Sequence, residues 1–186
     1  MKFLVGKKLK MTRIFTEDGI VRAVTAIEAK PTEISEIKTN EKSGYDAIKV
    51  KTENRKKSKF SEFRLRDDQV DVKVGDKISV DTFNIGDIVT AIGISKGKGF
   101  SGTIKRYHFV QGPKSHGSNQ QRRVGSIGAG YPQRVIKGQR MPGHMGSERV
   151  TVKNLEIVEV DTENNILLIA GAIPGATGSE VRIIGN

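Results

Sequence analysis

Three glycines in the stretch SKGKGFSG have the spacing of a phosphate-binding loop. Residues 97–102 form the pattern G-x-G-x-x-G directly after the strand-like run DIVTAIGIS, a context in which glycines let the backbone approach a dinucleotide. Such a site also needs a helix and, about 20 residues on, an acidic side chain for the ribose. Here the Gly-Pro dipeptide at 112–113 ends any helix early, and the next acid is Glu148. Kinase motifs are also absent. The sequence therefore argues against a nucleotide-dependent enzyme.

The three histidines are the other candidates for chemistry. His108, His116 and His144 lie in the same part of the chain, where Glu148 is the one acid, and the chain has no cysteine. Metal-binding histidines usually combine close spacing with thiolate or carboxylate ligands. A serine hydrolase would need a nucleophile turn and an orienting carboxylate, and neither pattern is present. We therefore expect no catalytic residue, no metal site and no cofactor.

The positive charge of the chain is concentrated in one internal segment. The 186 residues carry a net charge of +11, and the segment from Ser95 to Arg149 holds eleven Lys or Arg against one acid. The same segment contains eleven of the 21 glycines and few apolar residues. Lys and Arg neutralise phosphates, and glycine permits close backbone approach. We interpret residues 95–149 as an arm that enters folded RNA, with backbone N–H groups of residues 97–102 facing phosphates beside Lys96 and Lys98.

Other partners of a basic chain fit the pattern less well. No apolar run approaches the roughly 20 residues that span a bilayer, and the basic segment lacks the Leu, Trp or Phe stripe of a membrane-surface helix. The opening MKFLVGKKLKM has too short an apolar run for a signal peptide. We expect a cytoplasmic protein with no membrane partner.

Short alternating runs on both sides of the basic segment predict β-strands. They are GIVRAVTAIEA, GYDAIKVKT, DKISVDTF and DIVTAIGIS before it, and RVTVKNLEIVEVD, ILLIAGAI and SEVRII after it. Strands at this spacing favour a small antiparallel barrel or sandwich, so the fold is predicted to be mainly β. Its domain is predicted to be discontinuous, residues 1–94 with 150–186. The apolar residues expected in the core include Val152, Leu155, Ile157, Leu167 and Ile169.

Three segments of the sequence allow two interpretations each. The motif KRYHF, Lys105 to Phe109, interleaves cations with aromatic rings and suits loop or single-stranded RNA; alternatively, Tyr107 and Phe109 pin the arm to the β-domain. The cluster NRKKSK, Asn54 to Lys59, either contacts RNA or is a solvated face. The wider segment Asn54 to Asp68 is either a polar loop or a short helix.

Several long blocks resemble the bacterial-type family of large-subunit ribosomal protein three. They are LVGKKLKMTRIFTEDG, SKGKGFSGTIKRYHF, HGSNQQRRVGSIG, KGQRMPGHMGSERVTVKNLEIVEVD and LLIAGAIPGATGS, and the likeness runs from about Val5 to Ser179. The resemblance implies a β-barrel of the translation-protein type with an extension that penetrates 23S rRNA toward the peptidyl-transferase centre. It also implies binding near the 3′ end of that RNA and action early in large-subunit assembly.

The expected partners are therefore 23S rRNA and neighbouring large-subunit proteins in the cytoplasmic ribosome, with no homo-oligomer and no enzyme activity. By the resemblance, the block Arg140 to Gly146 forms the tip nearest the peptidyl-transferase centre. A free-standing RNA-binding regulator is the alternative function. The residues expected to contact rRNA are Lys7, Lys8, Lys96, Lys98, Lys105, Arg106, Tyr107, His108, Lys114, His116, Arg122, Arg123, Arg134, Lys137, Arg140, His144 and Arg149.

The sequence departs from the family pattern at three places. His144 stands where some bacterial members have a glutamine that is methylated, so that modification cannot occur here. Tyr107 stands where a tryptophan is frequent, which leaves a smaller face for stacking. The region after Thr52 is shorter than in many members, and this puts any contact made by that region in doubt.

Overall fold

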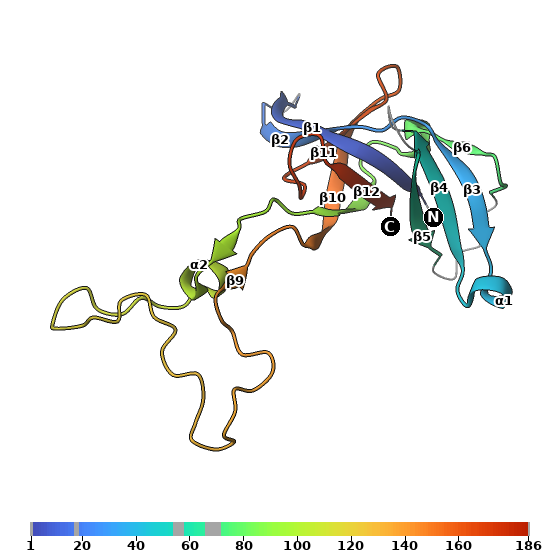
Figure 1. The fold of residues 1–186 in the computed structure, drawn as a ribbon. Coiled ribbons are helices and arrows are strands. Elements are labelled where there is room, and N and C mark those ends of the chain that lie inside the picture. The colour runs from blue at the N-terminus through green and yellow to red at the C-terminus, as the bar shows by residue number, and fades with distance from the viewer. Residues whose placement is uncertain (1, 17–18, 54–57, 66–71, 186) are drawn as a thin grey trace. The chain divides into compact units, whose positions relative to one another are not determined.

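The protein is mainly β, as the sequence predicts (Figure 1). The structure is a computed structural model that describes residues 2–16, 19–53, 58–65 and 72–185. The chain divides into two compact units: residues 1–95 with 149–186, here named the β unit, and residues 96–148, here named the basic unit. The elements in chain order are β1 (Phe3–Phe15), β2 (Val21–Glu28), β3 (Thr32–Lys38), α1 (Asn40–Ser43), β4 (Ala47–Glu53), β5 (Ser58–Arg64), β6 (Lys77–Ile78), the 3-10 helix η1 (Val80–Thr82), β7 (Ile88–Ile94), β8 (Phe100–Ser101), α2 (Thr103–Tyr107), β9 (Gly143–His144), β10 (Arg149–Asp161), β11 (Ile166–Ala170) and β12 (Glu180–Gly185).

Six strands of the β unit pair antiparallel in the order β1-β12-β7-β10-β11-β2, and β2 pairs with β1 again to close a barrel. Burial alternates residue by residue along β7, β11 and β12, because successive side chains of a strand point to opposite faces of the sheet. The alternating apolar residues that predicted these strands are therefore the ones that fill the interior.

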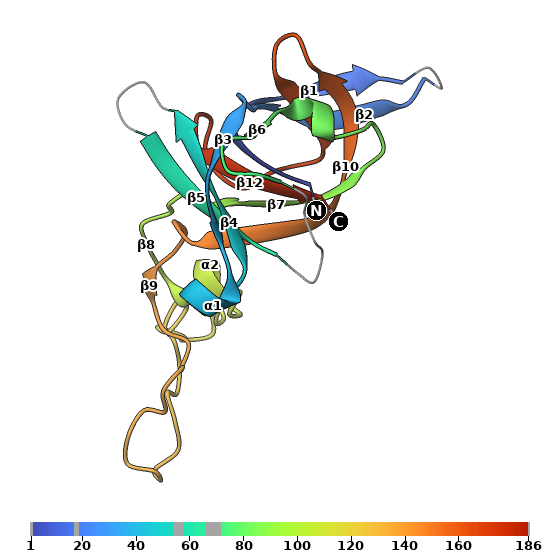
Figure 2. The same cartoon turned by 90° about the vertical axis from the view of Figure 1, so that its right-hand side faces the viewer.

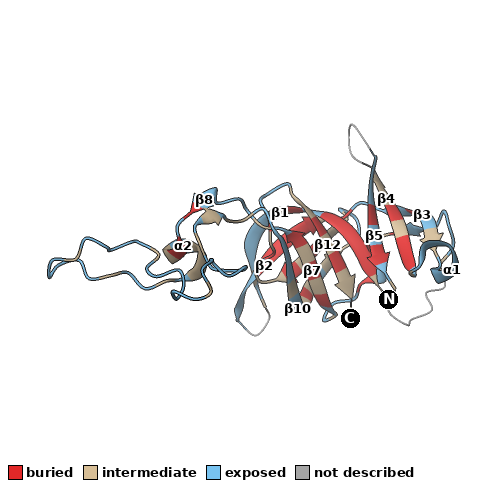
Figure 3. Cartoon of the chain, turned by 60° about the horizontal axis from the view of Figure 1, so that its bottom comes forward, coloured by how far each residue is buried: buried red, intermediate tan, exposed pale blue. Residues whose placement is uncertain are grey.

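A second antiparallel sheet, in the order β5-β4-β3-β6, shares the core of the β unit (Figure 2). The ring of Phe3 in β1 stacks on that of Phe63 in β5, with the centroids 4.7 Å apart. The first four residues of β1 are all buried, since one face of the strand lines the barrel and the other meets the second sheet. Figure 3 shows that buried residues are concentrated in the strands of the β unit.

The structure corrects the sequence prediction in several places. The part of Asn54 to Asp68 that is described is neither loop nor helix but strand β5, with Ser61 and Phe63 buried; residues 54–57 and 66–68 lie outside the described ranges. Only Lys77–Ile78 of the run DKISVDTF is a strand, and a 3-10 helix follows it. Strands β1 and β3 were not predicted; in β1 the first four residues are all buried and most of the later ones are exposed, so the strand as a whole does not alternate.

The predicted core residues are confirmed in part. Ile157, Leu167 and Ile169 are fully buried. Val152 and Leu155 are only half-buried, because the pairing of β10 with β7 shifts register between them and a bulge of this kind turns the strand locally. In the described ranges no helix is long and apolar enough to cross a membrane.

Candidate nucleic-acid interface

The basic unit presents an almost uncompensated positive surface. It carries ten Lys or Arg and a single carboxylate, Glu148, and its only buried residues are Ser101 and Thr103. One carboxylate can neutralise only a small part of that charge, so the unit is suited to a polyanion. The exposed cations are Lys96, Lys98, Lys105, Lys114, Arg122, Arg123, Arg134, Lys137 and Arg140.

The two ends of the basic unit are held together by an antiparallel pairing. Strand β8 pairs with β9, the backbone N–H of Lys98 donates to the carbonyl of Met145 at 2.9 Å, and the N–H of Met145 donates to the carbonyl of Gly99 at 3.0 Å. We name this pairing the neck, residues 96–101 with 143–147. The N–H of Lys98 is used within the protein, which argues against the expectation that it faces a phosphate.

The neck accounts for Gly97, the first glycine of the pattern that resembled a nucleotide loop, and for Gly146. A Cβ on Gly146, which has φ +81°, would collide with the Lys96 carbonyl oxygen, and a Cβ on Gly97 would lie 2.9 Å from the Ser147 hydroxyl. Glycine at these positions lets two backbones approach closely. Gly97 and Gly146 therefore serve chain packing, whereas a Cβ on Gly99 or Gly102 would meet nothing within 4 Å.

The neck places the block Arg140 to Gly146 at the base of the basic unit. Strand β9 belongs to this block, and it pairs with β8, only a few residues from where the chain enters the unit. That this block is the part of the arm nearest the peptidyl-transferase centre stays a prediction.

Tyr107 is the centre of a cluster that joins distant parts of the basic unit. The guanidinium carbon of Arg106 lies 4.9 Å from the centroid of the Tyr107 ring, and that of Arg140 lies 5.7 Å from it. Arg106 also donates from Nη1 to the carbonyl of Met141 at 3.0 Å, and the ring of Phe109 is 6.4 Å from that of Tyr107. The cluster fixes the base of the unit, so Arg106 and Tyr107 have a structural role whether or not they also meet a ligand.

The three histidines are exposed and separate in role. His108 and His116 both have φ of +60°, the left-handed region that non-glycine residues adopt mainly in turns, and His108 caps the C-terminus of α2. His144 is paired through its backbone with Phe100 in the neck. Among the residues that the structure describes, no group of three or more His, Cys, Asp or Glu could hold a metal ion.

The two lysines of the VGKK motif have opposite environments. Lys7 is exposed. Lys8 is 9% exposed, and its ammonium group donates to the carbonyls of Ile173 at 2.6 Å and Gly175 at 3.1 Å. This placement argues against the prediction that Lys8 contacts rRNA. Neighbouring residues of a strand point to opposite faces, and nothing in the motif itself indicates which of the two lysines faces inward.

Two exposed aromatic side chains were missed by the sequence analysis. Phe100 is 80% and Tyr131 is 88% exposed, both in the basic unit. Exposed rings beside cations are the stacking platforms of proteins that bind unpaired nucleic acid. Their position inside the basic, apolar-poor segment was the available signal. Arg149, the last cation predicted, is exposed and begins β10 in the β unit.

A closed β-barrel carrying a separate, acid-poor cationic unit defines a protein built for a polyanionic partner. The family model described as Ribosomal protein L3 matches residues 5–181 of the chain. The proteins named Large ribosomal subunit protein uL3 from Thioalkalivibrio sulfidiphilus (strain HL-EbGR7) and Finegoldia magna (strain ATCC 29328 / DSM 20472 / WAL 2508) are each 46% identical to it, over 97% and 98% of this chain and 94% and 97% of the relative. A protein of the same name from Pseudomonas aeruginosa (strain UCBPP-PA14) is also 46% identical, over 97% of this chain and 94% of its own length.

The chain therefore belongs to the ribosomal protein L3 family, which confirms the resemblance drawn from its motifs. Membership makes it a ribosomal protein, and the family is a structural one rather than a family of enzymes.

Proposed function

We propose that this protein is a structural constituent of the large ribosomal subunit whose basic unit binds 23S rRNA near its 3′ end. Family membership supports the ribosomal assignment. One observation carries the RNA-binding part: residues 96–148 hold ten cations against one carboxylate, and nine of the cations are exposed. The rRNA contacts proposed are Lys7, Lys96, Lys98, Lys105, Lys114, Arg122, Arg123, Arg134, Lys137, Arg140, Arg149 and the three histidines, together with Phe100 and Tyr131.

The mechanism is electrostatic and conformational. Phosphates of RNA helices that converge repel one another, and exposed Lys and Arg side chains inserted between them remove that repulsion while releasing counterions. Residues 95–149 form the rRNA-penetrating arm, directed toward the peptidyl-transferase centre. Residues 1–94 and 150–186 form a translation-protein-type barrel that anchors the arm. By stabilising packed RNA helices, the protein assists an early step of subunit assembly in the cytoplasm, beside neighbouring large-subunit proteins and without forming homo-oligomers.

The contacts that hold the base of the arm leave most of its cationic side chains available for a ligand. The neck and the Tyr107 cluster use backbone hydrogen bonds, Arg106 and the Arg140 guanidinium. The side chains of the exposed lysines of the unit take no part in these contacts of the neck and the cluster. The base is therefore fixed by one set of residues, and another set is left for phosphates.

A fourfold substitution tests the proposal. Lys96, Lys98, Lys105 and Lys114 are replaced together by Gln, and Arg106 is left in place because it holds the Met141 carbonyl. The affinity for a large-subunit rRNA transcript is plotted as log affinity against log salt, which gives a negative slope. If each lysine meets a phosphate, the magnitude of this slope should decrease by about 3, at about 0.7 per contact. The matched control replaces four exposed lysines of the β unit, Lys10, Lys42, Lys73 and Lys77.

Equal salt slopes for the two variants would show that these lysines of the basic unit do not bind RNA, and would contradict the proposal. Co-sedimentation separates the proposed function from the free-standing regulator: a ribosomal constituent is found in the large-subunit peak of a sucrose gradient, whereas a regulator remains mainly at the top. A regulator would also be absent from purified large subunits after a high-salt wash.

A further inference from the structure

A groove in the β unit forms a second cationic surface, separate from the basic unit. We infer that this groove binds the phosphates of an RNA strand, so that the protein holds rRNA with two surfaces rather than one. The inference rests on the proposed rRNA-binding function, and it assigns a role to Arg64, Lys153 and Arg182, which the sequence analysis did not single out.

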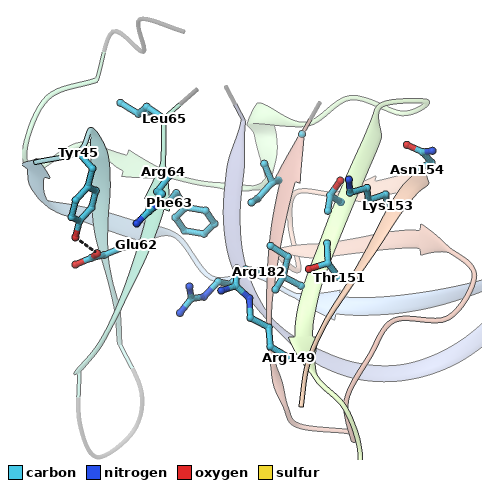
Figure 4. A pocket seen from close by; sticks show the side chains of 14 residues that line it. Tyr45, Glu62, Phe63, Arg64, Leu65, Arg149, Thr151, Lys153, Asn154 and Arg182 are labelled. Carbon is cyan, nitrogen blue, oxygen red and sulfur yellow. Dashed lines mark hydrogen bonds between the residues drawn. The ribbon is translucent and has the colours of Figure 1, made fainter. Parts of the chain in front are cut away.

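The groove lies between the barrel and the second sheet and has a volume of about 1410 Å³ (Figure 4). Strand β5 and Tyr45 form one wall, and strands β7, β10 and β12 form the other. The cross-strand register explains the second wall: Thr151 and Arg182 both pair with Ile92, and directly paired residues lie on the same face of a sheet. The three side chains therefore form one row across the strands.

A bulge adds to the polar lining of this wall. The pairing of β10 with β7 shifts between Val152 and Leu155, and Asn154 has φ of +57°. Regular alternation puts Lys153 on the same face as Thr151, and a bulge lets the following residue turn to that face as well. Lys153 and Asn154 consequently both line the groove.

Four cations face the groove: Arg64 on one wall, and Arg149, Lys153 and Arg182 on the other (Figure 4). The Arg64 guanidinium lies against the Tyr45 ring, with its carbon 5.0 Å from the ring centroid. Among the described residues, no carboxylate pairs with any of the four; the ion pairs of the β unit use Lys2, Arg22, Lys30, Lys38, Lys49 and Lys59.

Among the residues that the structure describes, Glu62 is the one carboxylate in the lining, and it is paired with a cation outside the lining. Its oxygens accept from the Lys38 ammonium at 2.6 Å and from the Tyr45 hydroxyl at 3.0 Å. The hydrogen bond from Lys38 lowers the pKa of Glu62, and the same contact raises the pKa of Lys38. Both groups therefore stay charged at neutral pH and their charges cancel. The four cations that face the groove are then left without a compensating charge in the described lining.

The side chains suit RNA better than an acidic peptide. Three of the four cations are arginines, whose planar forks bind phosphate oxygens in a bidentate manner. Thr151 and Asn154 add a hydroxyl and an amide, which contact phosphate and sugar in protein–nucleic acid interfaces. A 2′-hydroxyl can both donate to and accept from such groups. Of the apolar lining residues, Phe63 is fully buried, so it offers no anchor to a peptide side chain.

The test is a threefold substitution in the full chain: Arg64, Lys153 and Arg182 to Gln. Arg149 is left in place because it adjoins the basic unit in sequence. The control replaces Lys10, Lys42 and Lys77 by Gln and removes the same charge from exposed positions of the β unit outside the groove. The probe is a transcript of the large-subunit rRNA, titrated between 0.05 and 0.5 M KCl, that is at about one third to three times physiological ionic strength.

Relative to the control, we expect the magnitude of the salt slope of the groove variant to decrease by about 2, at about 0.7 per lost contact. We expect its affinity for the transcript at 0.15 M salt to fall by about 50-fold. A groove variant that matches the control overturns the inference. So does a variant that binds RNA normally but yields particles lacking a neighbouring protein, because the groove would then hold protein. If the groove variant fails to fold, the single change Lys153→Gln, at an exposed position on the bulge, should still lower the slope by about 0.7.

The fourfold variant of the basic unit separates this inference from the proposed function. If that variant binds RNA like its control while the groove variant is weakened, the groove is supported and the proposed role of the basic unit fails. If the basic-unit variant is weakened and the groove variant is not, the reverse holds.

Discussion

The two lysines at the start of the chain should respond to the same substitution in opposite ways. We predict that Lys8→Met destabilises the β unit and that Lys7→Met does not. Methionine keeps most of the length and apolar volume of the lysine stem and removes only the ammonium group. The comparison therefore isolates the ammonium at two adjacent positions of β1, one buried and one exposed.

The size of the effect follows from the contacts of the Lys8 ammonium. It donates to the carbonyls of Ile173 and Gly175, in the segment that connects β11 to β12. A hydrogen bond to a charged group contributes about 1.5–3 kcal/mol, and a buried acceptor left without a donor costs about 1–3 kcal/mol. Allowing for relaxation and for water reaching one carbonyl, we expect Lys8→Met to lower the free energy of unfolding by about 3 kcal/mol. For a protein of this size that corresponds to a fall of about 10 °C in Tm.

The assay is urea and thermal unfolding followed by circular dichroism, which reports mainly the β unit because the basic unit has little regular structure. Lys7→Met should unfold within about 0.5 kcal/mol of the parent, as surface substitutions usually do. It should instead reduce the salt slope of RNA binding by about 0.7 if Lys7 meets a phosphate. Equal unfolding midpoints for Lys8→Met and the parent would refute the structural role assigned to Lys8.

Three further predictions concern the neck and the charge of the β unit. Gly146→Ala should open the neck, because a Cβ there collides with the Lys96 carbonyl, and hydrogen exchange at the Lys98 N–H should accelerate; Gly128→Ala, where a Cβ meets nothing within 4 Å, should leave it unchanged. His144→Gln should support large-subunit assembly nearly as the parent does, since Gln also donates and accepts, whereas His144→Ala should give immature particles or slow peptide transfer; normal gradients and normal transfer for His144→Ala would make the side chain a spacer. Hydrogen bonds from the Lys2 ammonium and the Asn84 N–H lower the pKa of Asp87, so its contribution to stability is complete above the ordinary value near 4 and is lost as the pH falls through its lower folded pKa; the stability difference between the parent and Asp87→Asn, measured by unfolding from pH 6 to pH 2, should shrink over that interval, and a constant difference would contradict the assignment.

Much of the β-domain could be predicted because its strands have one buried and one exposed face. The run RVTVKNLEIVEVD corresponds to β10 residue for residue, and ILLIA to β11. Strands β1, β3 and β5 lack a clear alternation in the sequence. In β5, Phe60 is exposed and Phe63 is buried, so apolar residues lie on both faces of the strand. The sequence therefore shows no clear alternation of apolar and polar residues there, and the segment was predicted to be a loop or a helix.

Of the candidate sites, the cationic segment could be predicted from the sequence, whereas the environment of Lys8 and the groove could not. Charge density is a property of composition, so the cationic segment is visible in the sequence. Which lysine of an adjacent pair faces inward depends on long-range packing, as Lys8 shows through its contacts with residues 173 and 175. The groove gathers Arg64, Lys153 and Arg182 from three strands far apart in the chain, and only the strand register brings them together.

The central claim is that the cations of residues 96–148 lie against large-subunit rRNA in the assembled particle. Ultraviolet crosslinking of purified large subunits, followed by identification of the peptides that carry nucleotides, tests it directly. We predict 23S rRNA adducts on peptides from the basic unit, with Phe100 and Tyr131 among the modified residues because aromatic side chains stack on bases. Adducts confined to peptides of the β unit, with every peptide of residues 96–148 recovered unmodified, would contradict it.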